Sequence, residues 1–463
     1  MVSTSDRGSW GSRTGFVLAA AGSAVGLGNI WGFPSQVGQG GGAVFVVVYL
    51  ACVLLICLPI MLAELAVGRA AQLDPVGSIR ALSPNSRWWL VGALGVLAGA
   101  GILSFYSVIA GWSLAYIWFA GTGAVTGDAD AIGAFFTRFT ANGPVNVGLT
   151  FIILGLTATV LIGGVRSGIE RVTKLMMPAL ITLLLILAIR AVSLPGAVEG
   201  LSYYLKPDFS RLFDPTDGPV LVNAALGQAF FSLSLGMGAM LTYGSYLDRK
   251  VSLVTAAGWV VLLDTGMALL AGFIIFPSGF SIPGFDPSAS GPGLIFVVLP
   301  RLFAELPGGQ LFGGAFFVLL TMAAVTSTIS LLEVPVAYVI DTHRWSRPRA
   351  VLLVATGVFL LAIPSALGNG AVNFLSRLPM VGMSFLDLMA TLWNNFALPL
   401  GGFLIAVFVG RAWGVNRALA EIERQDTSLT GHALWSFLIR WVCPVAIAMI
   451  IVYTVRSMWQ PDA

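Results

Sequence analysis

The chain has 463 residues, of which 57% are hydrophobic and only 10% are charged, and its formal net charge is +3. Soluble globular proteins carry about 25% charged residues, so this composition excludes a soluble protein and indicates one that is solvated by a lipid bilayer. The basic residues form no stripe or block along the sequence, which excludes a nucleic-acid-binding protein.

Eleven apolar segments are long enough to cross a hydrocarbon core that is about 30 Å thick and needs about 20 helical residues. In chain order they cover residues 14–36, 41–68, 88–121, 147–164, 168–192, 219–246, 251–279, 311–340, 349–367, 379–410 and 433–459. A shorter apolar stretch, residues 293–306, is interrupted by proline and is expected to form an extracellular cap between the seventh and eighth spans. Most of the 24 Lys and Arg residues fall on the side of the N-terminus, which predicts a cytoplasmic N-terminal segment, residues 1–13.

The first and sixth spans are expected to be broken near their centres. The first contains the run Ala21-Gly-Ser-Ala-Val-Gly-Leu-Gly-Asn29, and the sixth contains Phe231-Ser-Leu-Ser-Leu-Gly-Met-Gly238. Glycine in one membrane helix can serve close packing alone. Two interrupted spans, at positions one and six, instead indicate a transporter made of two inverted five-helix repeats. The expected repeats are residues 14–192 and 219–410, followed by an eleventh helix at 433–459.

Backbone groups at such breaks can bind a solute and ions. Half-helix N-termini present N–H groups that suit a carboxylate, whereas unwound carbonyl oxygens suit Na⁺ or an ammonium group. Neutral side-chain oxygens are available in the two runs and in the eighth span, from Asn29, Ser232, Ser234, Thr326 and Ser327. Hydroxyls within a helix can also bond to carbonyls of the same helix, so the spacing leaves both interpretations open for Thr326 and Ser327.

Ionisable residues inside spans are expensive and therefore indicate function. Asp264 lies deepest, within the seventh span, and is the strongest candidate. For Glu64 and Glu333 a structural hydrogen bond and a transport role are both open. Tyr106, in the third span, is an aromatic residue with a polar group in the same layer.

The sequence contains no nucleophile–base pair, no His/Cys metal-binding cluster and no Gly-rich phosphate-binding motif. An enzyme is therefore not predicted, and no ATPase subunit is expected as a partner.

Several motifs together resemble the neurotransmitter:sodium symporter family, in its bacterial amino-acid transporter branch. They are Trp10-Gly-Ser-Arg-Thr-Gly15, Gly22-Ser-Ala-Val-Gly-Leu-Gly-Asn29, Phe33-Pro34, Gly40-Gly-Gly-Ala43, Gly227-Gln-Ala-Phe-Phe-Ser-Leu-Ser-Leu-Gly236, Thr242-Tyr-Gly-Ser-Tyr246 and Thr326-Ser-Thr-Ile-Ser330. The resemblance implies an all-α integral membrane protein with the LeuT-type 5+5 inverted repeat, broken helices one and six, and eleven transmembrane helices.

The resemblance also implies two sodium sites and a substrate site. The first sodium site would use the Ala24 carbonyl with Asn29, Ser232 and Asp264, and the second would use carbonyls of Gly22, Val25 and Ala323 with the hydroxyls of Thr326 and Ser327. The substrate carboxylate would meet the N–H groups of Leu27 and Gly28 and the Tyr106 hydroxyl, and its ammonium would meet carbonyls of Ala24, Phe231 and Ser232 near Ser234. The side-chain pocket would be lined by Ser23, Ile102, Phe231, Met237, Ser327, Thr328 and Leu331.

The inner gate of the family is expected at Arg7 and Asp341, beside Trp10, Ser245 and Tyr246, and Gly168 and Pro178 match a helix-unwinding motif in the fifth span. The outer gate departs from the family pattern. Gly32 stands where a cation is usual, and the acidic partner position falls on Ala390, with Asp387 about one turn away. The absence of both residues of the usual ion pair is consistent, because either one alone would leave an unpaired charge.

These residues predict a sodium-coupled symporter that imports a small neutral, hydrophobic amino acid by alternating access, in the plasma (inner) membrane of a prokaryote. Chloride independence is expected because Asp264 supplies a fixed negative charge. Tyr49, Gln228 and Ser232 occupy three chloride-site positions of the family, but the fourth falls on Ala268. Two alternatives stay open: transport of another small zwitterion, such as a betaine or N-methylated amino acid, and a solute receptor that does not transport.

Overall fold

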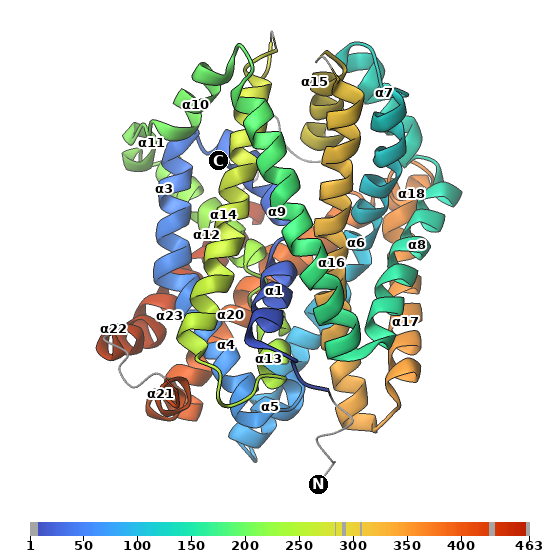
Figure 1. Ribbon diagram of the computed structural model, residues 1–463. Helices are drawn as coiled ribbons and strands as arrows, with labels where there is room; N and C mark the ends of the chain where they lie inside the picture. The colour runs from blue at the N-terminus through green and yellow to red at the C-terminus, as the bar shows by residue number, and fades with distance from the viewer. Residues whose placement is uncertain (1–7, 283, 289–292, 306–307, 426–430, 460–463) are drawn as a thin grey trace.

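The computed structural model describes residues 8–282, 284–288, 293–305, 308–425 and 431–459. In this part of the chain all regular secondary structure is helical, and most of the long helices run between the two ends of the molecule (Figure 1). Labels with η denote turns of π-helix. The first half contains α1 (Arg13–Ala24), η1 (Gly28–Gly32), α2 (Phe33–Gln39), α3 (Ala43–Cys52), η2 (Val53–Cys57), α4 (Leu58–Ala71), α5 (Pro75–Leu82), α6 (Trp89–Thr122), α7 (Ala129–Thr140), α8 (Gly143–Ile162), η3 (Val165–Glu170) and α9 (Arg171–Val192).

The second half begins with two short helices that lead into the broken sixth span. It contains α10 (Ala197–Leu205), α11 (Ser210–Phe213), α12 (Asp217–Ser232), α13 (Ala239–Ser245), α14 (Leu253–Gly279), η4 (Leu294–Val298), α15 (Leu299–Glu305), α16 (Gly309–His343), α17 (Arg347–Leu367), α18 (Asn373–Ser376), α19 (Phe385–Ala390), η5 (Thr391–Ala397), α20 (Leu398–Val407), η6 (Phe408–Gly414), α21 (Val415–Ile422), α22 (His432–Phe437), η7 (Leu438–Val442) and α23 (Cys443–Trp459).

Nine continuous helical stretches of the described residues are long and apolar enough to cross a membrane. A tenth span is formed by α1 with η1 and α2, which pass the same test together and meet at a bend of 52°. The expected sixth span consists of α12 and α13, and residues 233–238 between them belong to no helix. With this pair counted as one span, the total agrees with the eleven spans expected from the sequence.

The cap that the sequence predicts near residues 293–306 corresponds to η4 and α15. These segments lie at the end of the molecule that also carries α7 and α10, whereas α5 and α21 lie at the opposite end (Figure 1).

Two long helices form the centre of the fold. Helices α6 and α16 pack against each other more extensively than any other pair. Small residues permit this close approach: a Cβ atom at Gly99 would lie 3.2 Å from the Leu331 carbonyl oxygen, and one at Gly314 would lie 3.3 Å from the Cα atom of Gly121. Such contacts are typical of membrane helices, which associate by packing rather than by the hydrophobic effect.

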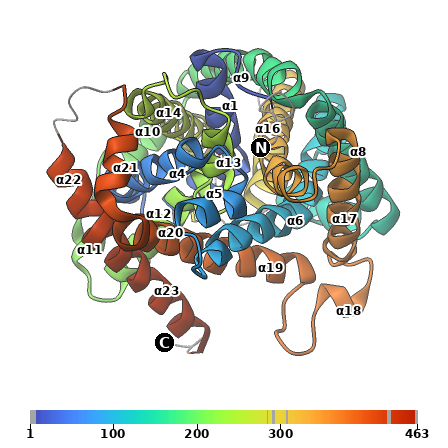
Figure 2. The same cartoon turned by 90° about the horizontal axis from the view of Figure 1, so that it is seen from below.

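The two broken spans lie next to each other beside this centre. Seen from below, α1 and α13 lie between α16 and α4 (Figure 2). The breaks in the first and sixth spans therefore face α6 and α16, and this arrangement positions the candidate site.

Candidate functional site

The break in the first span exposes backbone groups that side chains partly satisfy. Helix α1 ends at Ala24 and η1 begins at Gly28. Between them, the N–H of Gly26 donates to Asn29 Oδ1 at 3.0 Å, and the N–H of Leu27 donates to the Tyr106 hydroxyl at 2.9 Å. Tyr106 thus reaches from α6 to the N–H group that the resemblance assigns to substrate recognition.

The break in the sixth span follows a left-handed backbone path. The φ angles are +53° at Ser234, +80° at Gly236 and +74° at Gly238, values that glycine adopts without strain and serine adopts rarely. The Ser234 hydroxyl donates to the Ser23 carbonyl at 3.0 Å, and the N–H of Gly236 donates to Glu64 Oε1 at 2.8 Å. One hydrogen bond therefore joins the break in the sixth span to the last turn of α1. Glu64 makes the structural hydrogen bond that was one of its two expected roles, and its role in transport stays open.

A fully buried carboxylate forms the first cluster of candidate sodium ligands. Asp264 on α14 accepts from Asn29 Nδ2 at 2.7 Å and from the Ser232 hydroxyl at 2.9 Å. The Tyr49 hydroxyl lies 3.3 Å from the Ser232 hydroxyl and donates to it. Three of the four residues expected at the first sodium site are therefore joined in one network.

The second cluster lies between α1 and α16. The Thr326 hydroxyl donates to the carbonyls of Ala323 at 2.9 Å and Val25 at 3.4 Å. The Ser327 hydroxyl lies within 3.4 Å of the same two carbonyl oxygens and 3.2 Å from that of Ser23. Each hydroxyl thus bonds to a carbonyl of its own helix and also faces carbonyls of the broken first span. The contacts are compatible with both expected roles, a bond within the helix and a sodium ligand.

A small cavity of about 20 Å³ lies between the two breaks. It is lined by Ser23, Ala24, Gly26, Gly28, Ile102, Tyr106, Phe231, Ser234, Met237, Ser327 and Leu331. No charged side chain belongs to this lining. Ten of these eleven residues were expected from the sequence.

Gly26 is the lining residue that the site prediction missed. A Cβ atom there would overlap with the hydroxyl groups of Tyr106 and Ser327. Gly26 could have been predicted from its position in the glycine-rich run Gly22–Asn29, most of whose residues were expected at the site.

Three residues expected at the substrate site are absent from this lining. Leu27 offers its N–H to Tyr106, and Ser232 belongs to the Asp264 cluster. The Thr328 hydroxyl lies 2.7 Å from that of Thr157 on α8, on the side of α16 that faces away from the cavity.

The segment that precedes α1 is attached to the sixth span. The indole N–H of Trp10 donates to the Tyr243 carbonyl at 3.0 Å, and its ring packs edge-on against the rings of Tyr243 and Tyr246. The Ser245 hydroxyl donates to a carbonyl within α13. Trp10, Ser245 and Tyr246 therefore lie together, as expected for an inner gate.

The expected ion pair of this gate involves Arg7, which lies outside the described residues. Asp341 accepts from the backbone N–H of Asp74 at 2.7 Å.

A second attachment of the same segment was not expected from the sequence. Glu170, in η3, accepts from the N–H of Gly11 at 2.6 Å and from the Ser12 hydroxyl at 3.0 Å, and it pairs with Lys174 at 2.6 Å. Because Glu170 lies between Gly168 and Pro178, the motif linked to unwinding in the fifth span also carries this contact.

Glu333, which the sequence left open, forms a buried ion pair. Its two oxygens accept from the Tyr246 hydroxyl at 2.7 Å and from Arg347 at 2.5 Å. These contacts join α16 to the start of α17 and to Tyr246, directly after α13. They are the structural contacts that were one of the two expected roles of Glu333, and its role in transport stays open.

The outer gate positions carry no ion pair. A Cβ atom at Gly32 would lie 3.1 Å from Gln228 Oε1, and Gln228 donates to the Gly28 carbonyl at 2.7 Å. Asp387 is exposed and accepts from the Ser384 hydroxyl at 2.7 Å, at the N-terminus of α19. Asp387 thus contributes to a helix cap.

A cavity of about 380 Å³ lies beside these outer positions. It includes Gln228, Asn223, Asn394 and Phe231. Phe231 lines both this cavity and the small one between the breaks, so its ring stands between the two spaces.

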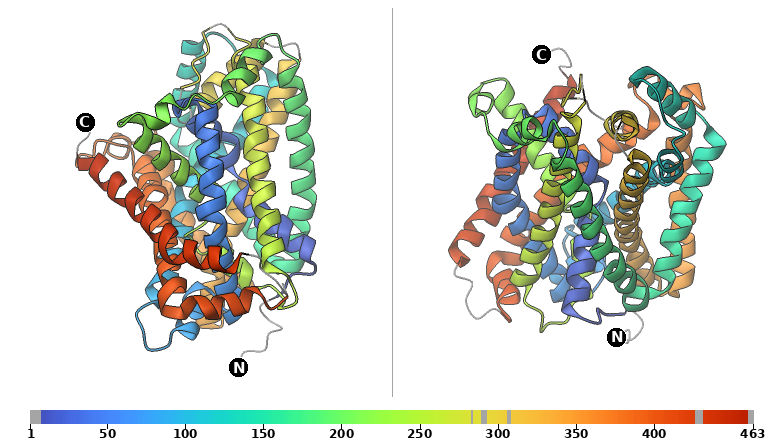
Figure 3. Two further views of the ribbon diagram at one scale, coloured as in Figure 1. Left: turned by 90° about the vertical axis from the view of Figure 1, so that its left-hand side faces the viewer. Right: turned by 45° about the horizontal axis from the view of Figure 1, so that its top comes forward.

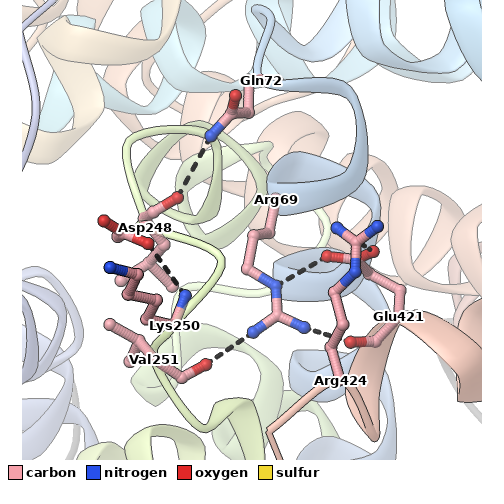
Figure 4. A network of polar contacts seen from close by, with 8 residues as sticks. Arg69, Gln72, Asp248, Lys250, Val251, Glu421 and Arg424 are labelled. Carbon is pink, nitrogen blue, oxygen red and sulfur yellow. Dashed lines mark hydrogen bonds and ion pairs between the residues drawn. The ribbon is translucent and has the colours of Figure 1, made fainter.

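A buried arginine connects three elements at the opposite end of the molecule (Figure 4). Arg69 on α4 donates from Nε to Glu421 Oε1 at 2.7 Å, from Nη1 to the Val251 carbonyl at 2.5 Å, and from Nη2 to the Glu421 carbonyl. Arg424 lies 3.4 Å from the other Glu421 oxygen. The pair therefore attaches α21 to α4 and to the loop that precedes α14.

Comparison with known proteins agrees with this architecture. The family model described as the sodium:neurotransmitter symporter family matches residues 7–127 and 131–462. The uncharacterized sodium-dependent transporter YhdH of Bacillus subtilis is 37% identical over 445 residues, which cover 95% of this chain and 96% of that protein. An uncharacterized sodium-dependent transporter of Haemophilus influenzae is 33% identical over 96% of this chain and 98% of its own length.

The crystal structure of MhsT in complex with L-phenylalanine is also similar. It has a TM-score of 0.88 and 44% sequence identity, covering 97% of this chain and 100% of that one. The match supports the LeuT-type fold that the two broken spans indicate. The chain therefore belongs to the sodium:neurotransmitter symporter family and is a multi-pass, sodium-dependent membrane symporter.

Proposed function

We propose that this symporter imports a small, neutral and hydrophobic amino acid together with two sodium ions, and that chloride is not required. The observation that carries the proposal is the uncharged cavity between the two breaks, with polar backbone at the breaks and apolar side chains opposite. A zwitterion matches this pattern, because its two charges suit backbone N–H and carbonyl groups. The similar structure of MhsT was solved with L-phenylalanine, which is a neutral, hydrophobic amino acid.

In this proposal the substrate carboxylate binds the N–H groups of Leu27 and Gly28 and the Tyr106 hydroxyl. The ammonium binds carbonyl oxygens at the ends of α1 and α12, from Ala24, Phe231 and Ser232. Ile102, Phe231, Met237 and Leu331 then surround the side chain. A charged side chain is disfavoured because no counter-charge lines the cavity.

Two sodium ions occupy the clusters beside this cavity. The first is bound by Asn29, Ser232, Asp264, the Ala24 carbonyl and the substrate carboxylate. The second is bound by Thr326, Ser327 and the carbonyls of Gly22, Val25 and Ala323. Because the first ion and the substrate share a contact, each increases the affinity of the protein for the other.

The second sodium ion controls the inner side. It bridges the broken α1 and α16, so its release frees α1 to move. The contacts of Trp10 with Tyr243 and of Gly11 with Glu170 hold the start of the same helix and must break when the inside opens. The sodium gradient is thereby coupled to the alternation between the outward-open and inward-open states.

Chloride independence rests on Asp264. Two sodium ions and an ammonium group against one substrate carboxylate leave an excess of positive charge in a site with few water molecules. The Asp264 carboxylate reduces this excess, whereas Ala268 offers no hydroxyl for an anion.

Uptake into proteoliposomes tests the proposal. A radiolabelled neutral amino acid should accumulate when Na⁺ is outside and should fail to accumulate when K⁺ replaces Na⁺. The substrate is first found by thermal-stabilisation screening of the purified protein with amino acids and betaines, with and without Na⁺. Equal uptake with either cation contradicts sodium coupling, and stabilisation without any uptake favours the receptor interpretation.

A betaine or N-methylated amino acid is the second candidate substrate, because Gly32 and Ala390 depart from the usual outer gate. Stabilisation by betaines and not by primary amino acids would favour it. The proposed setting is the plasma (inner) membrane of a prokaryote with the N-terminus in the cytoplasm, which reporter fusions at the two ends would check.

A further inference from the structure

Two exposed arginines lie on neighbouring segments of different spans, η6 and η7, at the lower end of the molecule. The guanidinium carbon of Arg411, in η6, lies 5.5 Å from the ring centre of Trp441 in η7. Arg440 lies against the neighbouring glycine: a Cβ atom at Gly410 would be 3.5 Å from the Cα atom of Arg440 and 3.7 Å from its Cγ atom. We call Arg411, Arg440 and Trp441 the arginine seam.

The positive charge of the seam is not neutralised by the described part of the chain. Neither Arg411 nor Arg440 forms an ion pair there. The neighbouring acidic residues are engaged elsewhere, because Glu421 pairs with the buried Arg69 and Glu423 pairs with His432 at 2.5 Å. An anion between these two segments would therefore be within reach of two long arginine side chains, without a competing carboxylate from Glu421 or Glu423.

An apolar face runs through the seam. Exposed hydrophobic residues recur every three or four positions along α22, η7 and α23, which places them on one side of the span. They are Leu434, Phe437, Trp441, Val445, Met449 and Val452, each 55–66% exposed. The oblique α23 lies at the outside of the molecule, and α21 and α22 lie at its lower end (Figure 3). Lipid chains can lie along this face, with a headgroup at the level of the arginines.

We propose that the arginine seam binds the phosphate of an anionic phospholipid whose acyl chains lie along this face. Guanidinium groups bind phosphate in a bidentate manner, and a tryptophan at the boundary of the membrane suits the headgroup region. A lipid with net negative charge is preferred, since a zwitterionic headgroup would bring its own cation next to two arginines. The apolar face distinguishes a phospholipid from free phosphate, which gains nothing from it.

Native mass spectrometry of the delipidated, purified full-length chain measures this binding. The chain is titrated with phosphatidylglycerol or with phosphatidylcholine of the same acyl chains. We expect at least tenfold tighter binding of phosphatidylglycerol, and a reduction of this preference to twofold or less in the variant with both Arg411→Gln and Arg440→Gln. Inorganic phosphate at millimolar concentration should not displace the lipid.

Arg80→Gln is the matched control. Arg80 is also exposed and lies 5.4 Å from a tryptophan ring, that of Trp89, but it belongs to α5, away from the seam. This variant should keep the full preference. The seam is refuted if the double variant, eluting as a monodisperse protein, retains the preference for phosphatidylglycerol, or if Arg80→Gln loses it equally. Should the double variant aggregate, Arg411→Gln and Arg440→Gln alone must each weaken phosphatidylglycerol binding at least threefold. The measurement does not depend on which solute is transported.

Discussion

Replacing Asp264 by asparagine removes one charge from the proposed first sodium site and nearly preserves its shape. The carboxylate accepts one hydrogen bond from Asn29 and one from Ser232. An asparagine of nearly the same size can keep the first with its oxygen. The second is lost, because the Ser232 hydroxyl already accepts from Tyr49 and from Asn29 and cannot also accept from the new amide. The substitution therefore removes one charge and one hydrogen bond with little change in side-chain size.

The size of the effect follows from the separation of the charges. Two unit charges about 4 Å apart interact by about 4 kcal/mol at an effective dielectric constant of about 20. Since about 1.4 kcal/mol corresponds to a tenfold change in affinity, Asp264→Asn should weaken sodium binding roughly 100- to 1000-fold, with a parallel loss of sodium-dependent uptake.

Equilibrium binding of radioactive sodium to the purified protein measures this change. Glu64→Gln is the matched control, because Glu64 is a buried carboxylate that accepts a backbone hydrogen bond outside the sodium clusters, and it should change sodium affinity less than tenfold. Uptake by the unmodified protein should be equal in chloride and gluconate. Sodium affinity of Asp264→Asn within about fivefold of the parent, or uptake that falls in gluconate, would refute the reasoning.

Three further predictions concern the gates and the fold. Gly32→Arg with Ala390→Asp should slow substrate exchange more than the two single changes together, and additive effects in this double-mutant cycle would mean that the positions are not partners. Gly26→Ala should lower substrate affinity at least tenfold, because its Cβ atom would overlap with two hydroxyl groups of the cavity; unchanged affinity in a binding assay would exclude the proposed pocket. Glu421→Gln leaves the Arg69 charge buried and unpaired, at a cost of about 3–5 kcal/mol, so it should lower the thermal unfolding temperature; an unchanged temperature would show that the pair is not needed for stability.

The sequence was sufficient to predict the breaks and the clusters beside them. The runs Gly22–Asn29 and Phe231–Gly238 predict interrupted helices, because several glycines weaken the helix in each run and the two runs occupy corresponding spans. The unpaired backbone groups of such breaks are tolerated at membrane depth only where they line a cavity or bind a ligand. The outer limits of most spans differ by a few residues, and the helical stretch of the tenth runs from Phe385 to Ile422 where 379–410 was expected, because hydropathy does not mark where a helix ends. Helix α16, for instance, extends to His343, three residues beyond the expected end of the eighth span.

Side-chain direction was harder to predict. Thr326, Ser327 and Thr328 are adjacent in sequence, but successive helical residues turn by about 100°, so Thr328 points to Thr157 and away from the cavity. Glu170 was missed because its partners include a backbone N–H group, and no residue type at position 11 signals such a contact.

The small volume between the breaks has a consequence for selectivity. A cavity of about 20 Å³ holds about one water molecule, so every solute must spread its walls before it fits. Those walls belong to different helices, α6 and α16 on one side and the two broken spans on the other. The size of the bound solute thereby sets the distance between these helices. We expect a small solute to allow the helices to close around it, and a solute that is too large to hold them apart and so prevent the change between the outward-open and inward-open states. Among neutral amino acids we therefore expect size to separate substrates from inhibitors.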